Sequence, residues 1–205
     1  MPLSGDGLAA FLIAVSFAAG LNVYATVATL GLLARAGLLA LPGELGLLAQ
    51  WWAIGGCGVL FVIEFVADKI PVFDLIWNAL QTFVRVPVAA LLGYGATHQL
   101  ELGWQLTAAV GGGAIALAAH GGKTAARAAV TPSPEPFSNF ALSVAEDAFT
   151  IFITWFSTRH PFLAAAIVVV LLVVIVVLLR WIVRALTSLS RLAFRKRREP
   201  TALRG

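Results

Sequence analysis

Charged side chains recur inside the apolar segments of this sequence, where burial makes them costly and therefore informative. Glu64 and Asp68 are four residues apart, so on a helix they lie on one face. In a wet cavity such a carboxylate pair could bind a cation or carry a proton. The alternative is that both acids pair with basic residues and only hold helices together; the candidate partners are Lys69, Arg85, Lys123 and Arg127.

Three basic or titratable residues follow the same spacing further along the chain. His120, Lys123 and Arg127 are three and four residues apart, so they also lie on one helical face. They could form an anion-binding stripe or pair with the acids. Arg127 and Lys123 could instead extend to the membrane surface, and His120 could be a hydrogen-bonded structural residue.

Two further segments carry candidate polar residues. Glu146 and Asp147 are adjacent within an apolar stretch, so they point in different directions, and at least one should be buried against a basic partner. The segment 134–139, Pro-Glu-Pro-Phe-Ser-Asn, starts another helix, where Asn139 could cap the backbone or the free N–H groups could hold an anion. The candidate substrate-binding or ion-binding residues are Glu64, Asp68, Lys69, Asp74, His120, Lys123, Arg127, Glu135, Asn139, Glu146 and Asp147.

Soluble-enzyme motifs are missing from the sequence. It has no nucleotide-binding glycine loop, no His-Glu-x-x-His and no G-x-S-x-G turn. A single cysteine, Cys57, excludes an internal disulfide and a multi-cysteine metal site. We therefore predict no catalytic residues, no cofactor and no metal, and expect the protein not to be an enzyme.

The composition indicates that these charges lie in a membrane. Hydrophobic residues make up 60% of the 205 residues and charged residues only 12%, whereas soluble domains have about 25% charged residues. We predict an all-α polytopic bundle, one transmembrane domain over residues 1–187, with about six helices. The expected spans are 8–36, 47–67, 72–97, 104–129, 137–156 and 162–183.

The stretch 72–97 is the least regular of these, because Asp74, Asn78, Gln81 and Arg85 share one face and Pro87 follows. It could be a re-entrant helix with a short span, which leaves five spans, or one broken span. Polar residues after small ones in spans one and four, and acids in spans two and five, also suggest a 3+3 inverted repeat.

The C-terminal tail fixes the predicted orientation. Residues 180–205 hold eight basic residues and one acid, a net charge of +7, while the first 179 residues hold six basic residues and nine acids, a net charge of −3. We predict a flexible, basic, cytoplasmic tail at 188–205, by the positive-inside rule, in a multi-pass protein of the inner (plasma) membrane. The tail could contact anionic lipids. No nucleic-acid partner is expected, and the chain could form a homo-oligomer.

Several of these segments together resemble one known family. The segments are 19–24 (AGLNVY), 64–71 (EFVADKIP) with Asp74, 120–123 (HGGK) with Arg127, and 133–139 (SPEPFSN) with Glu146 and Asp147. They are similar to a family of bacterial integral membrane proteins named only as domain of unknown function 4126. The resemblance covers about residues 8–156. It implies a membrane protein and no particular substrate.

Three functions remain open from the sequence. The first is a small transporter or channel-like protein, proton-coupled or ion-coupled, with a charged intramembrane cavity for a small solute or ion. The second is a protein that binds or translocates lipid headgroups through its basic residues. The third is a structural scaffold whose internal charges are all paired.

Overall fold

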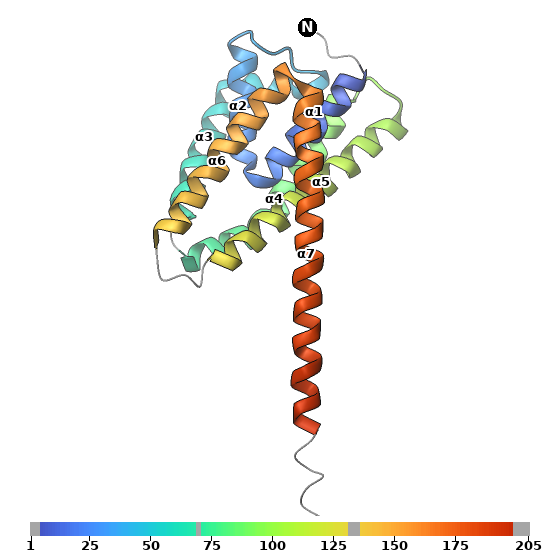
Figure 1. Cartoon of the computed structure of the whole chain (residues 1–205). Coiled ribbons are helices and arrows are strands. Elements are labelled where there is room, and N and C mark those ends of the chain that lie inside the picture. Colours follow the sequence, from blue (N-terminus) through green and yellow to red (C-terminus); the bar gives the residue numbers. More distant parts are fainter. Residues whose placement is uncertain (1–4, 69–70, 131–135, 199–205) are drawn as a thin grey trace, which may run out of the picture.

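The computed structural model describes residues 5–68, 71–130 and 136–198, and for residues 43, 71–75, 128–130, 136–139, 186 and 188–198 it describes the backbone alone. All its regular elements are helical: α1 (Gly5–Leu21), α2 (Val23–Arg35), the 3₁₀ helix η1 (Gly43–Ala49), α3 (Trp51–Ala67), α4 (Pro71–Ala96), α5 (Leu102–Val130), α6 (Pro136–Arg159) and α7 (Pro161–Arg198). The chain is an all-α polytopic membrane bundle (Figure 1).

The first apolar segment folds back on itself at Asn22. We expected one span over 8–36, but the structure has two helices of 17 and 13 residues separated by Asn22 in an extended conformation. The Asn22 side chain accepts a hydrogen bond from the Ala25 N–H at 3.0 Å, which caps α2. Asparagine is among the best residues for this position, and the cap starts a new helix in a new direction. The helices α1 and α2 form the two arms of a hairpin (Figure 1).

Contacts along the arms show that both open ends of this hairpin lie at the same end of the bundle. The start of α1 lies beside the α4–α5 connection, because Gly5 and Leu8 line one pocket with Thr97 and Trp104. The far end of α2 lies against η1, where a Cβ on Gly31 would meet the Leu48 carbonyl oxygen at 2.3 Å. We call this the N-terminal end of the bundle. The hairpin tip therefore ends inside the bundle.

Five helices of the described chain run from one end of the bundle to the other. They are α3, α4, α5, α6 and α7 (Figure 1). Four segments are long and apolar enough to cross a membrane: 76–96, 102–127, 140–159 and 161–185; α1, α2 and α3 are shorter apolar helices. The stretch 72–97 belongs to a single helix that continues through Pro87, so it is neither broken nor re-entrant. The segment that reverses direction within the bundle is the first one instead.

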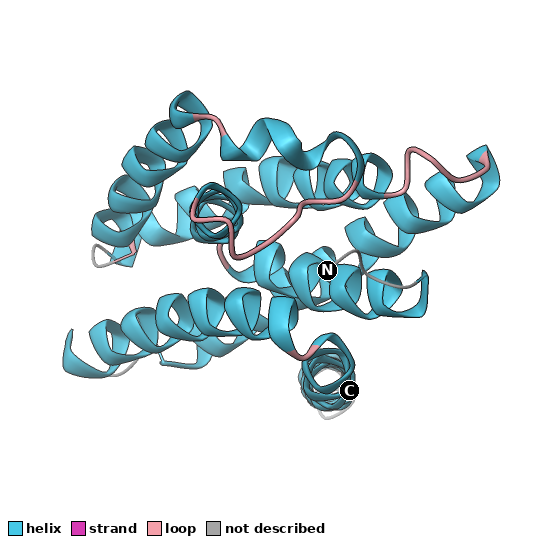
Figure 2. Ribbon diagram, turned by 90° about the horizontal axis from the view of Figure 1, so that it is seen from above, coloured by secondary structure: helices cyan, strands magenta, loops and turns pink. Residues whose placement is uncertain are grey.

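The last helix extends well past the bundle. One face of its first turns is buried, with Ala164 and Val168 fully enclosed, and Ile175 packs close to Gly122 of α5. Beyond that point its apolar side chains are exposed, as a membrane anchor requires. Seen from above, α7 stands at the edge of the bundle (Figure 2). We call the end toward which it runs the tail end. The predicted flexibility of 188–205 stays a prediction, although the helix continues to Arg198.

Small residues let the hairpin penetrate this far. A Cβ on Gly20 would lie 2.4 Å from the Ala116 carbonyl oxygen, so the backbones of α1 and α5 touch there. Two apolar clusters surround the arms, one around Phe11 and Leu30 and the other around Phe17 and Ile153. Close backbone approach of this kind is how helices associate in membranes. It places the hairpin tip between α3, α4, α5 and α6.

A 3+3 inverted repeat would place a break like the one at Asn22 in the second half of the chain, and the described residues show none at the equivalent position. The first predicted span is divided at Asn22, whereas its proposed equivalent, α5, is one helix of 29 residues. The repeat stays a prediction.

Candidate functional site

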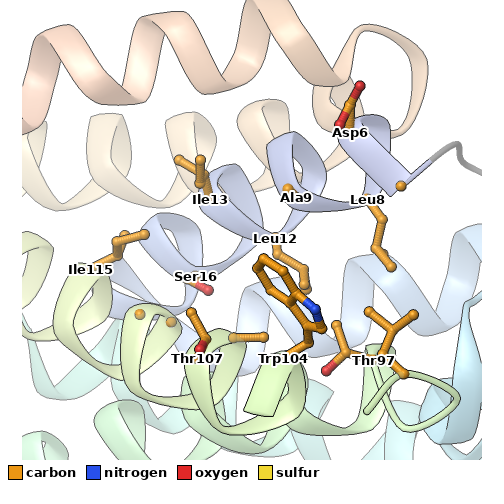
Figure 3. A pocket seen from close by; sticks show the side chains of 15 residues that line it. Asp6, Leu8, Ala9, Leu12, Ile13, Ser16, Thr97, Trp104, Thr107 and Ile115 are labelled. Carbon is orange, nitrogen blue, oxygen red and sulfur yellow. The ribbon is translucent and has the colours of Figure 1, made fainter. Parts of the chain in front are cut away.

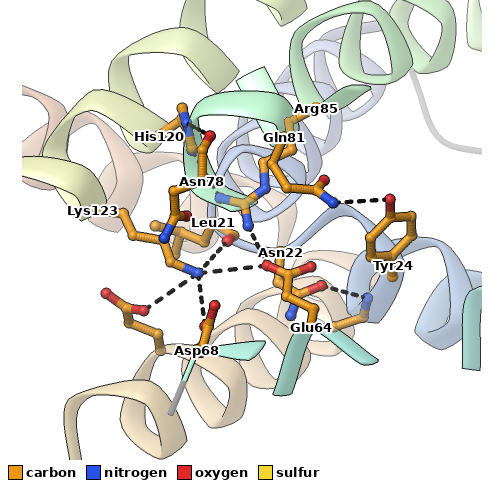
Figure 4. A network of polar contacts seen from close by, with 12 residues as sticks. Leu21, Asn22, Tyr24, Glu64, Asp68, Asn78, Gln81, Arg85, His120 and Lys123 are labelled. Carbon is orange, nitrogen blue, oxygen red and sulfur yellow. Dashed lines mark hydrogen bonds and ion pairs between the residues drawn. The ribbon is translucent and has the colours of Figure 1, made fainter. Parts of the chain in front are cut away.

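The hairpin tip leaves backbone carbonyls without helical partners, and two cations bind them. The side chain of Arg85 donates through Nη1 to the Gly20 carbonyl oxygen at 3.3 Å. Lys123 Nζ donates to the Leu21 carbonyl oxygen at 3.2 Å (Figure 4). These carbonyls end α1 and carry the negative pole of its dipole. The tip is therefore a fixed, partly negative surface inside the protein.

Carboxylates from neighbouring helices surround the same two cations. Arg85 forms an ion pair with Glu64 in which neither side chain is exposed. Lys123 Nζ lies 3.6 Å from a Glu64 oxygen, 3.4 Å from Asp68 and 3.4 Å from Glu146. The cluster thus joins α3, α4, α5 and α6 around the tip.

A third cation closes the cluster on the side of α6. Arg127 Nη2 lies 2.7 Å from an Asp68 oxygen and 2.8 Å from a Glu146 oxygen, and Nη1 also donates to the Asp68 carbonyl at 3.3 Å. Glu146 is the most accessible member, with 12% of its side chain exposed. The charged cluster therefore touches the outside of the described bundle at Glu146.

His120 is held as a neutral ring. Its Nδ1 lies 2.8 Å from Arg85 Nη1, and its Nε2 lies 3.0 Å from the Asn78 carbonyl oxygen. Because a guanidinium N–H can only donate, Nδ1 of His120 must be the acceptor of the bond with Arg85. Nε2 must then carry the ring hydrogen and donate it in a hydrogen bond to the Asn78 carbonyl oxygen. A second proton on Nδ1 would face the arginine donor. His120 therefore positions Arg85 and contributes no charge.

Asp147 differs from the other three acids. It accepts a hydrogen bond from Asn22 Nδ2 at 2.9 Å through Oδ1. Within the described residues no basic side chain lies within ion-pair distance of it, and its buried Oδ2 has no hydrogen-bond partner. The side chain is 5% exposed. Asp147 thus places a carboxyl group against the hairpin tip without a counter-ion.

The charges in the cluster do not balance among the described residues. Four carboxyl groups face three cations, which leaves one negative charge in excess because His120 is neutral. Desolvating an unpaired charge costs several kcal/mol. Further buried oxygens lack hydrogen bonds to described groups, including Glu64 Oε2, Asp68 Oδ1 and Ser143 Oγ. The arrangement can hold one proton or one small cation.

Seven of the predicted site residues meet in this cluster: Glu64, Asp68, His120, Lys123, Arg127, Glu146 and Asp147. Four others fall outside the described side chains. Lys69 and Glu135 lie outside the described residues, and Asp74 and Asn139 lie in helices whose backbone alone is described there.

The most central groups that the site prediction left out are Arg85 and Asn22. Arg85 was named only as a pairing partner, although its shared face with Asn78 and Gln81 was a visible signal. Gln81 Nε2 donates to the Tyr24 hydroxyl at 3.1 Å and so ties α4 to the start of α2 (Figure 4). The role of Asn22 follows from the chain reversal, whose only signal in the sequence is a polar residue in an apolar run.

The family model described as domain of unknown function 4126 matches residues 9–181, which include every described member of the cluster and the hairpin except the first four residues of α1. The chain belongs to this family. No curated protein and no solved structure matches it. Membership therefore confirms the resemblance of the sequence motifs, and the function must come from the site itself.

A separate pocket lies between α1 and α5 at the N-terminal end of the bundle. Its volume is about 440 Å³ and its walls are mainly apolar, with Leu12 and Trp104 prominent and Ser16 at the side nearer the tip (Figure 3). None of the charged cluster lines it. The pocket and the cluster are distinct features of the fold.

Proposed function

We propose that the protein is a small ion-coupled transporter of the inner membrane, with the charged cluster at the hairpin tip as its ion site. The observation that carries the proposal is the excess acid among the described residues. Three buried carboxyl groups and the partly exposed Glu146 face three cations, and Asp147 has no described counter-ion. One proton or one small monovalent cation would neutralise the excess.

The backbone at the tip supports the same function. Discontinuous helices at membrane depth are typical of transporter binding sites, because exposed helix ends hold charges without side chains of their own. Irregular backbone at such depth is tolerated only inside protein or beside a water-filled cavity. Here the end of α1 faces Arg85 and Lys123. A change of charge in the cluster would therefore act directly on the hairpin.

The alternatives are less favoured by the same contacts. A lipid phosphate would need free basic groups, but Lys123 and Arg127 are 3% exposed and already bind carboxylates. A pure scaffold would need every internal charge to be paired. Asp147 and the unpaired oxygens of Glu64 and Asp68 argue against that within the described chain.

The direct test is ion flux through purified protein in proteoliposomes. The vesicles contain a pH-sensitive dye, and parallel vesicles contain dyes for Na⁺ and K⁺, each under an imposed voltage. We expect the wild type to conduct one of these ions faster than empty vesicles. The Asp147→Asn variant should fall to the level of empty vesicles, because it removes the excess charge and keeps the shape beside Asn22.

The matched control is Asp6→Asn, which changes an exposed acid at the start of α1 and should keep wild-type flux. Monodispersity and thermal unfolding in detergent show whether Asp147→Asn is folded. Wild-type flux equal to that of empty vesicles in all three dyes would sink the proposal.

A further inference from the structure

A stripe of buried hydroxyl side chains leads away from Asp147 along α6. Thr150, Thr154 and Ser157 follow it at spacings of three, four and three residues, and none is exposed. Ser143, also fully buried, lies one turn before Asp147. All five residues share one helical face because their spacings repeat the helical period. This hydroxyl stripe, with Asp147, spans α6 from near its start to the N-terminal end of the bundle.

The stripe runs beside the hairpin. Asp147 bonds the tip at Asn22, and α6 packs against both α1 and α2. The other faces of α6 differ in character: Ile151, Phe152 and Trp155 are exposed and apolar. Polar side chains in membrane helices that turn away from lipid mark the routes of ions and protons. A buried hydroxyl face that carries an unpaired carboxyl has the side chains that such a route needs.

The three hydroxyls that follow Asp147 along α6 already donate to their own helix. The Thr150 hydroxyl donates to the Glu146 carbonyl at 2.8 Å, Thr154 to the Thr150 carbonyl at 2.7 Å, and Ser157 to the Thr154 carbonyl at 2.7 Å. These bonds satisfy the donors and hold the side chains in place, while the oxygen lone pairs remain able to accept from water. Successive hydroxyls are roughly 5 Å apart along the axis, so single waters must complete the chain.

We infer that the coupling ion is a proton, and that it travels between Asp147 and the N-terminal end of the bundle along the hydroxyl stripe. This rests on the proposed function. A metal cation would need several oxygen ligands together, and no cluster of His, Cys, Asp or Glu side chains able to hold a metal exists among the described residues. One carboxyl oxygen suffices for a proton.

The proton balance is simple. A hydronium ion in the wetted stripe gives its proton to the Asp147 carboxylate, so one O–H bond breaks as another forms and the excess charge of the cluster disappears. The carboxylic acid then loses the proton toward Glu146, the most accessible acid of the cluster. Because the tip meets both Asp147 and Lys123, the hairpin experiences each change of charge. The hairpin arms, which cover the stripe, would admit or exclude the waters.

The test compares three variants in the proton-flux assay. Thr154→Val keeps the side-chain shape but removes the hydroxyl, and flux should fall about tenfold, the effect of one lost hydrogen bond on a barrier. Thr154→Ser keeps the hydroxyl and should conduct like the wild type. Thr158→Val is the matched control, because this threonine makes the same kind of bond, to the Trp155 carbonyl, at an exposed position.

A second measurement is independent of flux. In a Cys57→Ser background, Ser157→Cys, at the N-terminal end of the stripe, should react with a small charged, membrane-impermeant thiol reagent added at that side, while the lipid-facing Ile151→Cys should not. If Asp147-dependent flux persists but Thr154→Val conducts like the wild type and Ser157→Cys stays unreactive, the stripe is overturned and the proposed function survives. If flux is carried by Na⁺ or K⁺ instead of protons, the inference is likewise wrong. Absence of any wild-type flux refutes the proposed function itself.

Discussion

At the scale of single residues, Lys123 holds the most diverse set of partners in the cluster. It lies within ion-pair distance of three carboxylates and also binds the end of α1. Its neighbour Arg85 has a narrower role, with Glu64 as its acidic partner and His120 as its acceptor. Removing one member of a buried ion pair costs far more than removing both, because the remaining charge stays desolvated.

This argument predicts the result of Glu64→Gln. The substitution leaves Arg85 without its carboxylate, and we expect a loss of roughly 3–5 kcal/mol in the free energy of unfolding. Denaturant titration in detergent, followed by tryptophan fluorescence, measures it. The double variant Glu64→Gln/Arg85→Gln should recover part of the loss, and Glu101→Gln, an exposed acid, should change little. Equal stability of Glu64→Gln and the wild type would contradict the importance of this pair.

At the scale of elements, the hairpin determines where the charges meet. Its arms have 17 and 13 residues, and its tip depends on contact between the backbones of α1 and α5 at Gly20. An added methyl group there would meet a backbone oxygen, which cannot move without shifting α5. In α5, Gly111 and Gly121 have open space beside them, whereas Gly112 and Gly122 are closely packed.

We therefore expect Gly20→Ala to destabilise the protein by roughly 1–3 kcal/mol, as overpacking does. Gly121→Ala, where an added Cβ meets nothing within 4 Å, should be neutral or slightly stabilising because alanine favours helix. Thermal unfolding of both variants gives the comparison. A Gly20→Ala protein as stable as Gly121→Ala would show that the tip does not depend on the close approach.

How far the sequence predicts these elements depends on whether the signal is local. The spacing of Glu64 with Asp68, and of His120 with Lys123 and Arg127, correctly placed each set on one helical face. The chain reversal was not predicted, because the Asn22 cap is stabilised by Asp147, 125 residues away. A periodic pattern carries no information on such a partner. The polar residues of 72–97 wrongly suggested a break in that segment, because the pattern alone could not show that the break lies at Asn22.

At the scale of the whole molecule, the re-entrant hairpin changes the expected arrangement of the termini. Six spans would put both ends of the chain on one side, and the basic tail would put that side in the cytoplasm. With the hairpin, the start of α1 lies at the N-terminal end of the bundle, while α7 runs toward the other end (Figure 1). With α3 counted beside the four helices that are long and apolar enough to span, we predict that the chain crosses the membrane five times.

This arrangement predicts a labelling pattern in intact cells. In a Cys57→Ser background, Asp6→Cys, Leu38→Cys and Leu100→Cys should all react with an impermeant thiol reagent added outside, because the three positions lie at the same end. Leu203→Cys in the basic tail should react only after the membrane is opened. Labelling of Leu38→Cys and protection of Asp6→Cys in the same cells would mean that α1 and α2 together cross the membrane, contrary to the hairpin.

Asn22 and Asp147 are 125 residues apart in the sequence, and this separation affects the order in which the protein can assemble during synthesis. The ribosome releases the hairpin first, and neither arm is as long as the roughly 20 residues that a stable span needs. Lys123, which binds the tip, is synthesised later, and its ion-pair partner Glu146 on α6 later still. Until then, the tip has no partner inside the bilayer. The hairpin must wait at the membrane surface or in the insertion machinery, so its entry would be among the last steps of assembly.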